Sequence, residues 1–245
     1  MNDKLQQIDT LLGELNQYRA NENYRITEAL EIEYTYDSNR IEGNTLTLHE
    51  TDMVVNKGIT IAGKGLREHL EAINHKEAID FIKNIAQKKE PISERVLLDI
   101  HAIVLHSIDK DNAGKCRRVP VIISGSKHIP PQPYLLQPQM DELFQWYEAN
   151  KDSMHPVVLA AQMHEKLVSI HPFIDGNGRT ARLLMNLILM QHGYPIANIK
   201  GDNETRRRYY ETLEEASSGD NSAFLEFIED VVIQSLTYYL KIIWG

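Results

Sequence analysis

Apolar residues spaced three and four apart run through most of the chain, and this spacing constrains the fold more than any other feature of the sequence. Such spacing places side chains along one face of an α-helix, where they can be buried. It is clear in Leu5, Ile8 and Leu12, and again over residues 157–170. Residues 183–190 are apolar on almost all sides, so we expect them to form a buried central helix. The sequence therefore predicts a mostly α-helical protein.

Only one segment has the composition of β-strands. Residues 119–123, Val-Pro-Val-Ile-Ile, precede the turn-like Ser-Gly-Ser-Lys, and His128-Ile129 follows before two prolines. This pattern predicts a short β-hairpin whose first strand, which contains Pro120, has an unpaired edge. No linker rich in Pro, Gly or Ser divides the 245 residues. We therefore expect a single domain, mostly α, that carries one short hairpin.

The composition excludes several classes of protein. Acidic residues outnumber basic ones and the net charge is −9, so the chain lacks the positive field that attracts proteins to nucleic acid. The single cysteine, Cys116, excludes an internal disulfide and a cysteine-rich zinc site. No apolar run approaches the ~20 residues of a membrane span, and no leader sequence is recognisable. We expect a cytoplasmic protein that binds neither nucleic acid nor membranes.

Residues 171–182, His-Pro-Phe-Ile-Asp-Gly-Asn-Gly-Arg-Thr-Ala-Arg, carry the strongest chemical signal. Pro172 disfavours helix at His171, so the preceding helix is expected to end there. Gly176 and Gly178 permit a tight turn and a close approach to the backbone. A helix then begins. Its first turn offers free N–H groups and the positive end of the helix dipole, which together bind anions.

Two arginines make this helix start unusual. Arg179 and Arg182 are three residues apart and share one face of the helix. The dipole disfavours cations at this end unless an anion lies beside them. Two guanidiniums next to free amide groups predict a pocket for several phosphates, and Asp175 is placed to hold Mg²⁺ together with phosphate oxygens. Each residue alone has an ordinary structural explanation, but the combination indicates a functional site.

This segment resembles the signature of the Fic family, His-x-Phe-x-Asp/Glu-Gly-Asn-Gly-Arg-x-x-Arg. Its eight specified positions match without a gap from His171 to Arg182. The resemblance covers most of the chain from about residue 38 onward and implies a Fic-type helical bundle. It divides the single domain over 1–245 into an N-terminal helical part, a Fic core and a C-terminal helix, over about 1–90, 91–215 and 221–244.

The resemblance implies transfer of AMP from ATP to a Ser, Thr or Tyr hydroxyl of a target protein and of the chain itself. His171 would be the general base, a role that an unperturbed imidazole pKa near ~6.5 suits. Asp175 would position Mg²⁺ on the phosphates, and Arg182 would hold the γ-phosphate. The remaining phosphate contacts would come from Gly176, Asn177, Gly178 and Arg179.

Two further segments resemble parts of Fic proteins that surround the nucleotide. The predicted hairpin resembles the flap, which would clamp an extended segment of the target protein by strand addition around Ile123 and Ser124. Tyr209 and Tyr210 resemble the nucleoside-side helix, on which some relatives have an Asn at the position of Ser217. The sequence is also compatible with a homodimer, because Tyr238, Tyr239 and Trp244 can belong either to the core or to a dimer contact.

Two glycines separate the chain from other branches of the family. The Doc branch, which phosphorylates its targets, has Lys at the position of Gly178. The branch that transfers phosphocholine tends to have Ala at the position of Gly176. Both glycines therefore favour AMP transfer.

An upstream motif predicts that the activity is restrained. Ser38 and Glu42 share a helix face, and Gly43 favours the end of that helix. Negative charge is disfavoured there by ~0.3–1 kcal/mol unless a cation compensates. The stretch matches the family's inhibitory motif, Ser/Thr-x-x-x-Glu-Gly/Asn, whose Glu pairs with the second arginine of the signature, here Arg182. We expect Glu42 to deny Arg182 to the γ-phosphate.

Two other functions are compatible with these residues. With Glu42 in place, some relatives remove AMP from a modified target, so the chain can also be interpreted as a de-AMPylating hydrolase. A non-catalytic module that binds nucleotide as a regulator is the second alternative. His171 and Asp175 argue against it, because a pure binder has little need for a base beside its phosphates.

Overall fold

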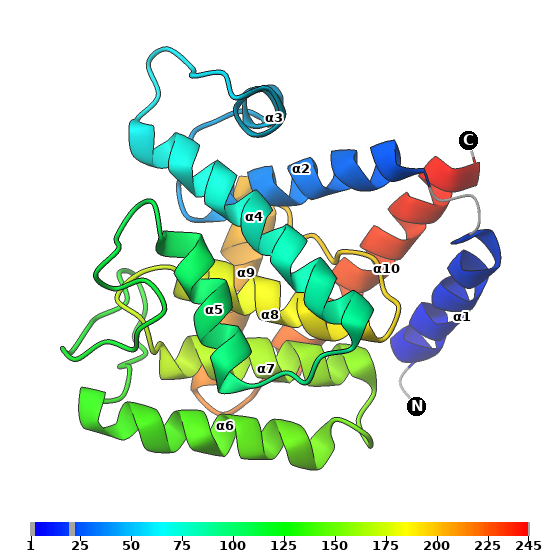
Figure 1. Ribbon diagram of the computed structural model, residues 1–245. Coiled ribbons are helices and arrows are strands. Elements are labelled where there is room, and N and C mark those ends of the chain that lie inside the picture. The colour runs from blue at the N-terminus through cyan, green and yellow to red at the C-terminus, as the bar shows by residue number, and fades with distance from the viewer. Residues whose placement is uncertain (1–2, 20–22, 245) are drawn as a thin grey trace.

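The computed structural model describes residues 3–19 and 23–244, which form a bundle of α-helices (Figure 1). The described elements are α1 (Asp3–Tyr18), α2 (Tyr24–Ile41), α3 (Leu48–Lys57), α4 (Leu66–Lys88), α5 (Glu94–Leu105), the short 3₁₀ helix η2 (Pro133–Leu135), α6 (Leu136–Asn150), α7 (Pro156–Ile170), α8 (Asn177–Gln191), α9 (Asn203–Ser217) and α10 (Ser222–Trp244). The prediction of a mostly α-helical protein is confirmed. Across these same residues, no helix combines the length and the apolar character that a bilayer crossing needs.

Helix α8, yellow in Figure 1, forms the centre of the bundle. It packs against α4, α5 and α7, and residues 183–189 have no exposed surface. A helix that is apolar on all sides is stable only when other elements surround it. The expected buried central helix is therefore present, and the glycine-rich turn that precedes it lies at one end of the most rigidly packed element.

Helix α2 crosses α4 and reaches α8 with its C-terminal end. The Asp37 carboxylate in α2 accepts hydrogen bonds from the Gly201 N–H at 2.9 Å and from the Asn198 side chain at 2.7 Å. The two backbones lie so close that a Cβ on Gly201 would be 2.8 Å from the Asp37 carbonyl oxygen. These contacts fix α2 near its C-terminal end, so Glu42, which follows it, is held beside the start of α8.

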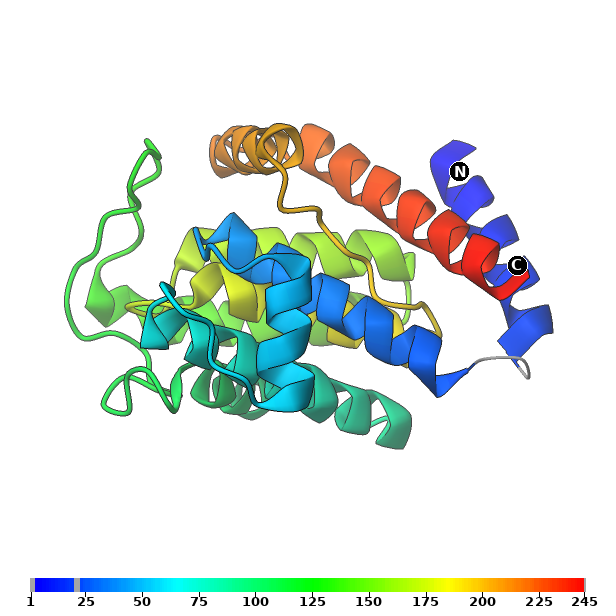
Figure 2. The ribbon, with the colours of Figure 1, turned by 90° about the horizontal axis from the view of Figure 1, so that it is seen from above.

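One hydrophobic cluster joins the two ends of the chain. It extends from Ile8 in α1 to Leu240 in α10, and α1 packs directly on α10 (Figure 2). Phe224 and Leu236 of α10 have no exposed surface. The N-terminal and C-terminal helices therefore belong to the same core as α8.

The predicted β-hairpin is wrong. Residues 119–131 form a loop that extends from one end of the bundle (green in Figure 2), with a turn closed by a 3.2 Å hydrogen bond from the Ser126 N–H to the Ile123 carbonyl. No strand occurs anywhere between residues 23 and 244, nor in 3–19. Pro120 has no N–H to donate to a ladder. Ile122 is 91% exposed, so pairing here would bury no apolar face.

The buried Arg117 side chain holds this loop in place of a ladder. Its guanidinium donates to the carbonyls of Val119 at 3.0 Å, Pro131 at 2.6 Å and His171 at 2.9 Å. The Arg117 N–H donates to the Pro172 carbonyl at 2.8 Å. Both ends of the loop are thus fastened to the end of α7 by one side chain.

Leu187→Ala tests the central position of α8. Leu187 has no exposed surface, and truncating such a side chain leaves a cavity that costs about 2–5 kcal/mol. We expect the free energy of unfolding, measured by urea denaturation, to fall by that amount. Ile122→Ala, in the exposed loop, is the matched control and should change it by less than about 0.5 kcal/mol. Equal effects of the two substitutions would contradict this packing.

Candidate functional site

The turn between α7 and α8 is shaped by two residues with positive φ. His171 ends α7 in the left-handed region at φ 49°, and Gly176 opens α8 at φ 79°. The Asn177 side chain closes the turn, since it accepts from the Phe173 N–H at 3.0 Å and donates to the Phe173 carbonyl at 2.9 Å. Both groups of the Asn177 amide are therefore engaged within the turn.

His101 in α5 packs against this turn and hydrogen-bonds to it. Its ring stacks on Phe173 with 3.6 Å between centroids and 7° between planes. Its Nε2–H donates to the Asp175 carbonyl at 3.0 Å, and its Nδ1 accepts from the Gly114 N–H at 3.0 Å. Burial lowers the pKa of His101 to about 4, so the neutral ring is the form that keeps both hydrogen bonds.

Arg182 is buried and binds the C-terminal end of α2. Its guanidinium donates to the Ser38 hydroxyl at 3.0 Å, to the Ser38 carbonyl at 2.9 Å and to the Glu42 carboxylate at 2.7 Å. The Arg182 side chain is 1% exposed and that of Glu42 is 31% exposed. Burial disfavours the charged guanidinium, but the Glu42 carboxylate more than offsets this and raises the pKa of Arg182.

The other side chains around Arg182 are neutral. The Tyr209 hydroxyl accepts from Arg182 Nη1 at 3.4 Å and donates to His164 Nε2 at 3.0 Å. Burial lowers the pKa of His164 to about 3. Burial also lowers the pKa of His75, and the nearby positive charge of Arg182 lowers it further. Glu42 is consequently the group that balances the charge of Arg182 in this structure.

Gly178 permits the close approach of Glu42. A Cβ at this position would lie 2.5 Å from Glu42 Oε1 and 3.1 Å from Arg182 Nη1. Tyr210, which is 43% exposed, donates from its hydroxyl to the Ile41 carbonyl at 3.2 Å. The end of α2 is thus held against α8 on one side and α9 on the other.

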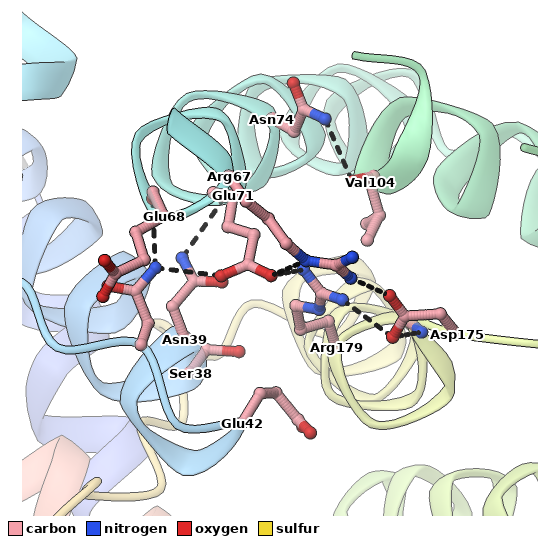
Figure 3. Close-up of polar contacts among 12 residues, drawn as sticks. Ser38, Asn39, Glu42, Arg67, Glu68, Glu71, Asn74, Val104, Asp175 and Arg179 are labelled. Atoms are coloured by element: carbon pink, nitrogen blue, oxygen red, sulfur yellow. Dashed lines mark hydrogen bonds and ion pairs between the residues drawn. The ribbon is translucent and has the colours of Figure 1, made fainter. Parts of the chain in front are cut away.

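Arg179 lies between two carboxylates (Figure 3). Its Nη2 donates to Asp175 Oδ1 at 3.1 Å, and its Nη1 is 3.6 Å from Glu71 Oε1 in α4. The Arg179 side chain is 3% exposed, and its Nε and Nη1 are buried without a hydrogen bond. Buried N–H groups of this kind are costly to leave unpaired, so Arg179 retains unused capacity to donate.

Asp175 is the exposed acid of the cluster. Its Oδ1 accepts from the Gly176 N–H at 2.6 Å as well as from Arg179, and its Oδ2 accepts from Arg67 of α4. Burial opposes ionisation of Asp175, but these partners outweigh it and lower the pKa of the carboxyl group. The side chain is 38% exposed, so a ligand from solvent can reach it.

His171 is neutral at pH 7. Burial lowers its pKa to about 4, against the ordinary value of about 6.5 that the sequence suggested. The neighbouring Val168 backbone partly opposes this shift, and the Arg117 charge reinforces it. Nδ1 is buried without a hydrogen bond of normal geometry, which leaves Nε2 as the ring nitrogen for chemistry.

The loop meets α9 at a groove of about 630 Å³. Ser217 and His128 line this groove, together with Lys127, Ile129, Glu211, Glu214, Glu215 and Ser218. The Glu214 carboxylate accepts from the Ser126 hydroxyl and, at 2.8 Å, from the Lys127 N–H. Ile123 and Ser124 lie in the turn that these contacts hold near α9.

The structure gathers most of the predicted site residues around the start of α8. The signature residues, Ser38, Glu42 and Tyr209 form one cluster, and Tyr210 adjoins it. Sequence reasoning missed His101, Glu71 and Arg67, which contact that cluster from α5 and α4. His101 could have been noticed as a lone polar residue on an apolar helix face. Arg67 and Glu71 gave no such signal, because their sequence pattern is that of an ordinary solvent-exposed helix.

Comparisons with known proteins agree with this geometry. A model of the Fic/DOC family matches residues 91–189. The chain is 39% identical over 210 residues to "Protein adenylyltransferase Fic" of Nematostella vectensis, a match that covers 85% of this chain and 48% of that protein. The chain therefore spans less than half the length of this relative.

Solved structures show the same fold over nearly the whole chain. A Fic-1 variant from C. elegans has a TM-score of 0.86 and 32% identity, covering 97% of this chain and 71% of that one. A Fic domain containing signaling protein from Bacteroides thetaiotaomicron has a TM-score of 0.88 and 29% identity, covering 99% and 97%. The fold and the site together define an α-helical domain with two buried arginines at the start of its central helix. The chain belongs to the Fic family.

The buried histidines predict how stability depends on pH. His101, His164 and His171 have pKa values of about 4, 3 and 4 in the folded protein and near 6.5 when unfolded. Between these values the unfolded chain binds more protons, so lowering the pH favours unfolding. We expect the free energy of unfolding, measured with urea, to fall progressively from pH 7 to pH 5. A constant value over this range would contradict the burial of the neutral rings.

Proposed function

We propose that the chain is a protein adenylyltransferase that transfers AMP from ATP to a hydroxyl group of a target protein and of itself. The observation that carries this proposal is the pair of buried guanidiniums, Arg179 and Arg182, at the N-terminal end of α8 beside the neutral His171. Two buried cations at that end of a helix call for a polyanion. The name of the relatives, protein adenylyltransferase, supports ATP as the source of that polyanion.

The residues fit a triphosphate with a divalent cation. Arg179 has buried N–H groups that lack hydrogen bonds, and the half-exposed Asp175 carboxylate adjoins them. Between residues 23 and 244 and in 3–19, no group of three or more His, Cys, Asp or Glu side chains is arranged for a metal. Mg²⁺ is commonly held by one carboxylate together with phosphate oxygens. Asp175 would provide the carboxylate, and the ion would neutralise part of the phosphate charge. We assign the phosphates to Arg179, Arg182 and the backbone of Gly176, Asn177 and Gly178.

His171 is assigned as the general base. The hydroxyl oxygen of the target attacks the α-phosphorus of ATP while its proton passes to His171 Nε2. The bond from the α-phosphorus to the oxygen that bridges it to the β-phosphate breaks, and pyrophosphate leaves with the electron pair. The pKa of about 4 keeps the imidazole neutral at pH 7, which is the form that can accept the proton.

Glu42 is assigned as the inhibitory residue. Its 2.7 Å ion pair with Arg182 occupies the guanidinium that the γ-phosphate needs, and Ser38 fixes that guanidinium through two further hydrogen bonds. A γ-phosphate must therefore displace a carboxylate from a buried cation before it can bind. This competition supports low activity of the unmodified chain.

We assign target recognition to the loop over residues 119–131, where Ile122 and Ile129 are 91% and 80% exposed. The groove between this loop and α9, which Ser217 lines, is assigned to the nucleoside, with Tyr209 and Tyr210 on the same helix.

A single domain over 1–245 is supported by the cluster shared between α1 and α10. We place the protein in the cytoplasm and retain a homodimer as compatible with the fold.

Glu42→Gly tests the inhibitory role. Removing the carboxylate frees Arg182 for the γ-phosphate, and we expect self-modification with ATP and Mg²⁺ to rise by about tenfold or more. Mass spectrometry should detect the added AMP and its site. Glu90→Gly, which removes a carboxylate from the turn after α4, is the control and should leave the level unchanged. Equal labelling of Glu42→Gly and the unmodified chain would contradict the inhibitory role.

His171→Ala, made in the Glu42→Gly background, tests the base. Loss of proton acceptance should reduce AMP transfer about 10²- to 10⁴-fold while nucleotide binding, followed by calorimetry with ADP, persists. His106→Ala, at a half-exposed position, is the matched control. Full transfer by the His171→Ala variant would show that another group accepts the proton. Release of AMP from a modified target by the unmodified chain would instead favour the hydrolase.

A further inference from the structure

Every charged group of the proposed phosphate and metal site is neutralised by a side chain from outside the signature. Glu42 pairs with Arg182, and Glu71 lies beside Arg179. Asp175 pairs with Arg67. We propose that Arg67 is an internal substitute for the divalent cation: its guanidinium occupies the Asp175 carboxylate in the nucleotide-free protein and must leave before a metal ion binds. This inference rests on the proposed function, because it takes Asp175 as the metal-binding group.

The geometry places Arg67 on the oxygen of Asp175 that the signature leaves free. Asp175 Oδ1 already accepts from the Gly176 N–H and from Arg179. Oδ2 accepts from Arg67 Nη2 (Figure 3). The oxygen that accepts nothing from the signature residues, and that would be available to a metal ion, is therefore the one that Arg67 holds.

Glu71 keeps the Arg67 guanidinium in this position. Arg67 Nε donates to Glu71 Oε1 at 3.1 Å, and the other Glu71 oxygen accepts from the Asn44 side chain at 3.0 Å. Asn44 follows Glu42 by two residues and also donates to the Glu68 carbonyl at 3.0 Å. Arg67 is thus oriented by a carboxylate that is itself fixed to the segment carrying the inhibitory residue.

Local helix energetics do not explain an arginine at this position. Arg67 is the second residue of α4, where the helix dipole disfavours a cation. Its pair with Glu71 has the basic residue first, which is the weaker of the two orders at this spacing. The contact with Asp175, 108 residues away in sequence, supplies the favourable interaction that the helix does not.

Arg67 is also the cation that can leave. Its side chain is 59% exposed, whereas that of Arg179 is 3% exposed. Moving an exposed guanidinium into water costs little, because solvent already screens its ion pairs. Arg67 is therefore the side chain that would move into solvent if a divalent cation were held at Asp175, while Arg179 would stay in place.

Arg67→Gln tests this competition through nucleotide binding. ADP is the probe, because it lacks the γ-phosphate and so avoids the competition with Glu42. The affinity for ADP is measured by calorimetric titration at a series of Mn²⁺ concentrations. The quantity compared between variants is the Mn²⁺ concentration at which half of the metal-dependent increase in affinity is reached. Removing one cation next to the metal should lower that concentration about fivefold, the change expected for a ~1 kcal/mol Coulomb interaction.

The control variants separate the possible failures. Arg95→Gln, at a position that is 82% exposed and paired with its own helix neighbour Asp99 at 3.0 Å, should leave the Mn²⁺ requirement unchanged. Asp175→Asn should abolish the metal-dependent gain. If it does not, or if the unmodified chain binds no ADP, the proposed function fails. If both behave as expected but Arg67→Gln leaves the Mn²⁺ requirement unchanged or higher, the inference about Arg67 is overturned.

Titration of ADP in EDTA adds one further decision. Without metal, Arg67 neutralises the Asp175 carboxylate beside the phosphates, so Arg67→Gln should bind ADP no more tightly than the unmodified chain. Tighter metal-free binding by Arg67→Gln would show that Arg67 obstructs the nucleotide itself, which would overturn its role as a substitute cation.

Discussion

The buried positive charge of Arg182 is the constraint on which the rest of the site depends. A guanidinium with 1% exposure must have an anion beside it, because an unpaired charge in the interior costs several kcal/mol. The histidines and tyrosines that surround it are neutral at pH 7 and cannot fill that role. The carboxylate of Glu42 is the anion that satisfies this cation in the structure, and under the proposed function a phosphate of the nucleotide is the alternative. The proposed inhibition and the proposed substrate binding thus follow from the same requirement.

The fold holds this cation at the end of its most rigid element. Helix α8 is enclosed by α4, α5 and α7, and the turn before it is closed by Asn177 and supported by the His101 ring. Helix α2 is anchored through Asp37, so Glu42 reaches Arg182 without needing its own rigid environment. The Arg182 guanidinium is therefore held in a fixed position, and the partly exposed Glu42 carboxylate pairs with it there.

Sequence reasoning predicted the parts of the molecule that local rules determine. Helix spacing identified the buried α8. The glycine turn with two arginines predicted an anion site at its start, and the structure places both arginines there, buried. The resemblance to Fic proteins supplied the pairing of Glu42 with Arg182, which helix periodicity alone does not predict. The predicted hairpin was wrong although its β-branched residues favour strand. Pro120 has no N–H to donate to a ladder, and the exposed Ile122 gives a strand no apolar face to bury. The pKa of His171 was misjudged because its burial depends on tertiary packing. Arg67 and Glu71 were missed because their partners, Asp175 and Asn44, are distant in sequence.

A crystal structure of the Glu42→Gly protein with the ATP analogue AMPPNP and Mg²⁺ would decide whether a phosphate replaces Glu42 at Arg182. We expect a triphosphate at the N-terminal end of α8, with the γ-phosphate hydrogen-bonded to Arg182 and the α-phosphate next to His171. Nucleotide bound elsewhere, such as in the cavity of about 470 Å³ that Leu30 and Tyr238 line near the N-terminal half of α2, with Arg182 left without an anion, would contradict it.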